Sequence, residues 1–188
     1  MQVEHGLARV VIDGGAEAEN RTFTFRPSFG RVASLGSPHE IVALYASLHG
    51  PRAAQDAAYV LACLCDQEDA TDLIGWADEA GPHPGRMPAA QQVILARHLM
   101  RHAIIGKAAP GKRGAGRFAE AFDASEYISA ARVHLGLSSE EADALSMTEF
   151  QQMFEMKFPQ AKGPDLATRE EYHAARAAYA KFGGRRNG

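Results

Sequence analysis

The stretch Ser37-Pro-His-Glu-Ile-Val-Ala-Leu-Tyr-Ala-Ser-Leu-His-Gly50 contains the clearest local structural pattern in the chain. Serine at the cap, proline at the first helical position and an acid three residues after the cap form a helix start. Apolar residues Ile41, Leu44 and Leu48 then recur on one face, until Gly50 ends the pattern. These fourteen residues therefore predict an amphipathic helix from about Pro38 to His49.

Similar patterns recur along the rest of the chain, and 35 of its 188 residues are alanine, the strongest helix former. We expect Asp123 to cap the helix that ends at Gly136, and capping boxes at Ser138 and Ser146. The sequence therefore predicts a mainly α fold, a multi-helix bundle. Besides one or two turns within 29–35, its helices are expected at 52–65, 69–80 (carrying Trp76), 88–105, 123–136, 139–145, 147–158 and 169–182.

The β-prone segments lie near the N-terminus, at 7–13 and 21–26. They predict a small antiparallel ribbon that ends at Pro27. Because a lone two-stranded ribbon is marginally stable, its Phe23 and Phe25 face should pack on helices. We expect these rings and Phe29 to converge on the apolar stripe of the helix that begins at Pro38.

Composition bounds the class of protein. A chain of this length forms one domain with extensions, and its net charge of -3 provides no general attraction to nucleic acid or an anionic membrane. We expect four parts: 1–106 with the ribbon and helices, a basic surface loop at 107–117, a helical segment at 118–158 packing on the first part, and 159–188 as linker and last helix. No segment has the apolar length of a membrane span. Residues 1–6 lack the basic start and the following apolar stretch of a signal peptide, so we expect none.

Cys63 and Cys65 lie in an apolar run and have no other cysteine to pair with. They are expected to be reduced thiols of a cytoplasmic protein.

Two motifs resemble cofactor sites, and each lacks a required residue. His98 and His102 have the spacing of two metal ligands on a helix, but Leu99 stands where a zinc protease has glutamate. Residues 106–113 have P-loop glycine spacing, but Arg113 stands where magnesium needs a hydroxyl. We therefore expect no metal and no cofactor, and the roles of the histidine pair and of the 107–117 loop stay open.

DNA binding and nucleophilic catalysis have even less support in the sequence. The helices from Ser139 to Phe158 could form a helix-turn-helix, but Glu149 and Glu155 on the second helix would repel phosphates. No Gly-x-Ser-x-Gly nucleophile motif is present. We expect no catalytic residues and no nucleic-acid partner.

Two stretches resemble a known family. Residues 21–35, Arg-Thr-Phe-Thr-Phe-Arg-Pro-Ser-Phe-Gly-Arg-Val-Ala-Ser-Leu, are similar to the opening of tailed-bacteriophage tail assembly chaperones and their gene-transfer-agent relatives. Residues 136–150, Gly-Leu-Ser-Ser-Glu-Glu-Ala-Asp-Ala-Leu-Ser-Met-Thr-Glu-Phe, look like that family's later segment. The middle of the chain looks like the longer phage proteins of this kind. Ala142 and Asp143 depart from an aromatic pair common in the family, and Gly36 replaces the usual acid.

The resemblance implies a non-enzymatic chaperone that binds the tape-measure protein and assists assembly of the major tail protein into the tail tube. Such a protein acts in the host cytoplasm, is absent from the mature virion, binds no cofactor and can self-associate. Methionine-rich amphipathic helices supply adaptable contact surface. The alternatives are a structural virion or tail component and a small helical DNA-binding regulator. The expected partner-binding residues are Met147, Glu149, Phe150, Met153, Phe154 and Phe158.

Overall fold

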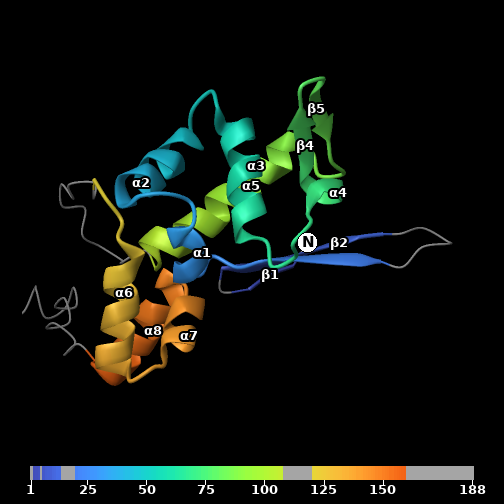
Figure 1. Cartoon of the computed structure of the whole chain (residues 1–188). Coiled ribbons are helices and arrows are strands. Elements are labelled where there is room, and N and C mark those ends of the chain that lie inside the picture. The colour runs from blue at the N-terminus through green and yellow to red at the C-terminus, as the bar shows by residue number, and fades with distance from the viewer. Residues whose placement is uncertain (1, 5, 14–19, 108–119, 160–188) are drawn as a thin grey trace, which may run out of the picture. The chain divides into compact units, whose positions relative to one another are not determined.

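The computed structural model describes residues 2–4, 6–13, 20–107 and 120–159 (Figure 1). The chain divides into two compact units, Met1–Lys157 and Phe158–Gly188. Most of the expected 107–117 loop and the expected helix at 169–182 lie outside the described residues. The predicted mainly α fold with a small N-terminal antiparallel β-ribbon is confirmed.

The N-terminal sheet has strands β1 (Gln2–Glu4), β2 (Leu7–Ile12) and β3 (Arg21–Phe25) in the order β1-β2-β3, all antiparallel. The sequence predicted β2 and β3 and missed β1, which is only three residues long. Ala8 pairs with Phe25, and Val10 with Phe23. This face of the sheet packs into the core, since both phenylalanine rings are buried.

Three helices follow the sheet: α1 (Phe29–Ala33), α2 (Pro38–Ser47) and α3 (Ala53–Leu64). The predicted start of α2 is confirmed, because the Glu40 carboxylate accepts hydrogen bonds from the Ser37 N–H and hydroxyl, both at 2.7 Å. These bonds also lower the pKa of Glu40. The end of α3 joins the sheet, where the Arg26 N–H donates to the Leu64 carbonyl at 2.8 Å.

The segment after α3 differs from the prediction of one helix at 69–80. Helix α4 covers only Thr71–Ile74, and strands β4 (Gly75–Asp78) and β5 (Gly81–Pro84) form an antiparallel hairpin with Trp76 on β4. Gly75 stops the helix at a φ of 92°, where other residues are strained. Pro82 and Pro84 lie two residues apart, so the same edge of β5 lacks a backbone N–H at both positions. A two-stranded ribbon tolerates this.

Helix α5 (Ala89–Met100) continues into a π-helical turn, η1 (Arg101–Ile105), and packs along α3 (Figure 1). The predicted helix is confirmed, but the expectation that its Val93 and Ile94 are buried along with Ala96, Leu99, Met100 and Ala103 is partly wrong. Ile94 is exposed and Val93 is half-buried, whereas Leu95 and Gln92 are buried. The apolar residues on α5 span more than one face, and α3 covers only part of them.

The last described helices are α6 (Ala124–Ala130), which continues into the π-helical turn η2 (Ala131–Leu135), then α7 (Ser139–Ala144) and α8 (Met147–Lys157). Their predicted caps are confirmed. Asp123 accepts from the Ser125 N–H at 2.9 Å, and Ser138 with Glu141 forms a capping box. Contacts place these helices in the same unit as the first 106 residues.

The core joins all three phenylalanines of the N-terminal segment with the helices. Phe23, Phe25 and Phe29 are buried, as are Ile41 and Leu48, in one continuous cluster. The burial of the three rings is therefore confirmed. Their convergence on the α2 stripe stays a prediction, because Phe29 stacks on Tyr127 and Leu44 is only half-buried. Both cysteines are free; Cys65 is buried and Cys63 half-buried, so burial raises the pKa of each thiol.

Candidate partner-binding surface

An aromatic cluster holds the C-terminal helices on α1. Phe29 stacks on Tyr127 of α6 with ring centroids 5.6 Å apart, and Tyr127 stacks on Phe122 at 5.2 Å. Phe150 of α8 completes the cluster by meeting Phe29 edge-on at 6.1 Å. We call Phe29, Phe122, Tyr127 and Phe150 the aromatic cluster. Their contacts fix where α8 lies and which of its faces points outward.

Three of the expected binding residues have structural contacts. Met147 and Phe150 are buried in the core. Glu149 accepts hydrogen bonds from the Ser146 N–H and hydroxyl, both at 2.8 Å, and so caps α8. A partner could reach Met147 and Phe150 only if α8 moved, whereas Glu149 is half-buried and already engaged in the cap.

The other expected residues lie closer to solvent. Phe154 is half-buried and meets His134 edge-on at 6.0 Å. Met153 is exposed, and Phe158 is an exposed residue that directly follows α8. The outward face of α8 therefore contains only part of the expected set.

Two further exposed apolar side chains were not among the expected residues. Met156 of α8 is 83% exposed, and it shares a helix face with Met153 because the two lie three residues apart. Val133 of the neighbouring η2 is 77% exposed. Val133 lies two residues after the buried Ala131, on roughly the opposite side of the helix, which accounts for its exposure. We call Met153 and Met156 the α8 face; Val133 lies beside Ser129, Arg132 and Leu137 instead.

The histidine pair lies on the last turn of α5 and on η1. The His98 and His102 rings are 4.5 Å apart, and His102 Nδ1 lies 2.8 Å from the Thr148 hydroxyl. His98 Nε2 is buried and has no hydrogen-bond partner among the described residues. Burial, with a smaller contribution from Arg101, lowers the pKa of His98. His102 therefore links η1 to α8, and the His98 ring of α5 beside it favours the neutral form.

Cofactor sites have no further support in the described part of the chain, where no three His, Cys, Asp or Glu side chains gather to hold a metal. Of the P-loop-like stretch 106–113, only Gly106 and Lys107 are described; Gly106 ends η1 with a φ of 75°. The Lys107 ammonium pairs with Glu155 of α8 at 3.0 Å.

Among the helices that the structure describes, none is long and apolar enough to cross a bilayer.

The fold and this surface define a small, mainly helical protein in which an aromatic cluster orients an exposed apolar helix face. The chain belongs to a family of unknown function, DUF6246, whose model matches residues 50–174. The match begins just before α3 and includes the β4–β5 hairpin and all helices through α8. Neither the curated proteins nor the solved structures contain a significant match.

Proposed function

We propose that this protein is a non-enzymatic tail assembly chaperone, which binds the tape-measure protein of a tailed phage and assists assembly of the tail tube around it. The proposal starts from the resemblance of residues 21–35 and 136–150 to that family. Binding of the major tail protein, action in the host cytoplasm and absence from the mature virion are parts of the same proposal.

One structural observation supports it above the others: the two stretches that carry the resemblance pack on each other. The Phe29 N–H donates to the Leu145 carbonyl at 2.8 Å, and Phe29 contacts Phe150. Gly30 faces Asp143, since a Cβ built on this glycine would lie 3.5 Å from the Asp143 Cβ. A hundred residues separate the stretches in the sequence, and their contact is consistent with both belonging to one structural unit of that family.

The positions that depart from the family pattern have local explanations. Ala142 is fully buried, so an aromatic ring at that position would have to displace its neighbours. Gly36 has a φ of 147°, a conformation that an acidic residue rarely adopts. These departures fit packing within this chain, and the client contact is assigned to the α8 face.

A tape-measure client is long and helical, and the α8 face has the chemistry to hold an apolar helix stripe. Methionine side chains adapt to differently shaped apolar partners at low energetic cost. Met153 and Met156 expose apolar side chains on α8, and the charged Glu155 and Lys157 lie beside them. Reversible capture of a client requires such shallow contact, because a deeply buried interface would not release it.

The test is co-expression with the tape-measure protein from the genome that encodes this chain. The wild-type chain should raise the soluble fraction of the client and be captured with it. The double variant Met153→Glu, Met156→Glu should lose both effects while remaining folded. The single variant Met156→Glu has Ile94→Glu as its matched control, because each places one glutamate on an exposed apolar position and the two positions lie on different helices.

Two results would replace the proposal with an alternative. Retention of the chain in purified phage particles would indicate a structural virion component. A shift of a DNA probe by the purified protein would indicate a regulator. If the wild type and the α8-face variant gave the same client solubility, the α8 face would not be the client-binding surface.

A further inference from the structure

The β4–β5 hairpin presents the chain's only tryptophan in a fixed and exposed position. Trp76 is 51% exposed, yet its ring stacks on His83 with centroids 4.0 Å apart and planes 14° from parallel. Among the described residues, its indole N–H has no acceptor. Exposed tryptophans that are held in place are typical of binding sites, where they contribute much of the affinity.

One carboxylate holds the hairpin turn and the histidine ring. Asp78 Oδ1 accepts from the Ala80 N–H at 2.9 Å and the Gly81 N–H at 3.2 Å, and it lies 3.1 Å from His83 Nε2. His83 in turn orients the indole through the stack. The Trp76 ring is therefore ordered before any partner arrives, which lowers the entropy cost of binding.

A buried amide attaches the base of the hairpin to α5. The Gln92 side-chain nitrogen donates to the Ile74 carbonyl at 2.8 Å and to the Met87 carbonyl at 2.9 Å, residues that lie just before β4 and just after β5. Both hydrogens of this NH₂ group are used, so the side-chain oxygen is the remaining group that a ligand could address. The hairpin is thereby fixed to the helical core.

A pocket of about 740 Å³ lies beside this platform, between the hairpin, α3 and α5. Its lining contains no aspartate, glutamate, lysine or arginine, and its residues are mostly small and apolar. A second hollow of about 300 Å³ adjoins it, since both are lined by Ala58, Ile74 and Gly75. The two hollows therefore lie next to each other along α3, and we call them together the groove.

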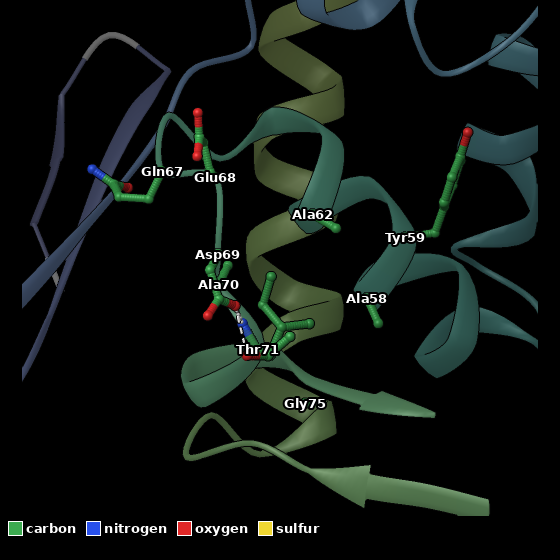
Figure 2. Close-up of a pocket in the computed structure, with 10 residues that line it drawn as sticks. Ala58, Tyr59, Ala62, Gln67, Glu68, Asp69, Ala70, Thr71 and Gly75 are labelled. Atoms are coloured by element: carbon green, nitrogen blue, oxygen red, sulfur yellow. Dashed lines mark hydrogen bonds between the residues drawn. The ribbon is translucent and has the colours of Figure 1, made fainter. Parts of the chain in front are cut away.

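The far end of the groove is acidic (Figure 2). Figure 2 shows Ala58 and Ala62 of α3 on one side and the hydrogen bond between Asp69 and Thr71 on the other. Hydrogen bonds from the Thr71 hydroxyl and N–H lower the pKa of Asp69, which favours its ionised form. Glu68 is a second exposed carboxylate in this lining. The groove thus combines an aromatic, uncharged end with a negative end.

We propose that this groove binds an extended peptide segment of a partner protein, with a proline against Trp76 and a lysine or arginine beside Glu68 and Asp69. Proline rings stack well on a flat indole, and the carbonyls of a polyproline II segment have no internal donors. The Trp76 N–H can therefore donate to such a carbonyl. This site is separate from the α8 face and does not depend on the chaperone proposal.

The full-length protein and the peptide acetyl-Pro-Pro-Ala-Pro-Pro-Ala-Lys-amide test the proposal, because all tryptophan emission comes from Trp76. Emission should change saturably with a midpoint between about 10 μM and 1 mM, the range of weak peptide binding. A peptide with glycine at every proline position should cause no saturable change. A peptide ending in glutamate should bind about 2–5-fold more weakly, the usual size of an exposed charge effect.

Two variants locate the site. Ala54→Arg places a long side chain at an exposed lining position and should abolish binding, whereas Ala46→Arg, an exposed helical alanine outside the groove, should not. Glu68→Lys should weaken binding about 2–5-fold, whereas Glu126→Lys on α6 should leave it unchanged. Circular dichroism establishes that each variant is folded.

The proposal is overturned if the proline and glycine peptides act alike, or if Ala54→Arg and Ala46→Arg bind equally. Should Ala54→Arg fail to fold, the peptide controls and the Glu68→Lys pair decide. Saturable binding of N-acetyl-tyrosinamide without binding of the proline peptide would also overturn it, because the groove would then be a site for a compact aromatic ligand.

Discussion

The aromatic cluster and the Trp76–His83 stack use the same interaction in opposite ways. Phe122 and Tyr127 stack at 5.2 Å with planes 14° apart, and Trp76 and His83 stack at 4.0 Å, also 14° apart. Phe29 and Phe122 are buried, however, whereas Trp76 is about half exposed. Similar ring geometry therefore stabilises the fold at one site and orients an accessible ring at the other.

The largest expected effect is at the centre of the aromatic cluster. Phe29→Ala should lower the free energy of unfolding by about 3–5 kcal/mol, because it removes a fully buried ring and leaves a cavity. Urea unfolding followed by circular dichroism measures this change. Phe29→Leu, which keeps most of the apolar volume, is the control and should cost clearly less. A loss below about 1 kcal/mol for Phe29→Ala would show that the cluster does not anchor α1.

A smaller effect is expected at the cap that begins α8. Ser146 is buried and its hydroxyl oxygen accepts from the Glu149 N–H at 3.2 Å while donating to the Glu149 carboxylate. Ser146→Ala should cost about 1 kcal/mol in thermal or urea unfolding. Ser139→Ala, at an exposed position in α7, should change stability far less. Equal effects of the two substitutions would contradict a capping role for Ser146.

His98 should make the free energy of unfolding depend weakly on pH. The pKa of His98 is lowered below its ordinary value of 6.5, so the unfolded chain binds this proton more readily than the folded chain. The contribution of His98 to stability is therefore complete above about pH 6.5 and is lost as the pH falls through the folded pKa. The His98→Gln variant should show a shallower fall in unfolding free energy from pH 7 to pH 5 than wild type. His39→Gln, at an exposed position, should follow the wild-type curve.

The smallest expected effect on stability is at Trp76, the exposed ring of the Trp76–His83 stack. Trp76→Ala should change the free energy of unfolding by no more than about 1 kcal/mol, because the ring is half exposed and contributes little buried area. Urea unfolding monitored by far-UV circular dichroism gives this value without the tryptophan signal. A loss as large as that of Phe29→Ala would mean that the stack belongs to the core and would remove the distinction between the two sites.

Sequence patterns predicted elements whose ends are set by local chemistry. The caps at Ser37, Asp123, Ser138 and Ser146 all occur where side-chain spacing placed them, because a cap needs only neighbouring residues. The helix expected at 69–80 was wrong because Gly75 and the Asp78 turn favour a hairpin, and only contacts with α3 and α5 make that hairpin stable. Helical periodicity cannot distinguish these outcomes over so few residues.

The candidate surfaces were less predictable than the fold. The sequence shows that Met147, Phe150 and Met153 are apolar residues of one helix. It does not show which of them α1 and α6 cover. The exposure of Val133 was missed because it was counted with the apolar side chains of its helix, although it lies two residues, about 200° round the helix, from the buried Ala131. The groove beside Trp76 depends on three elements meeting, so residues such as Gln92 and Ala54 had no sequence feature that marked them.

Time-resolved anisotropy of the Trp76 emission tests most directly whether the exposed ring is held in a fixed orientation. In the native full-length protein, the stack on His83 and the Asp78 hydrogen bonds should make the indole rotate with the whole molecule, on the nanosecond timescale. The His83→Ala variant should gain a rapid component, because its indole loses the stacked ring. A dominant sub-nanosecond component in the wild-type protein would contradict the account, since a freely rotating Trp76 could not serve as an ordered binding platform.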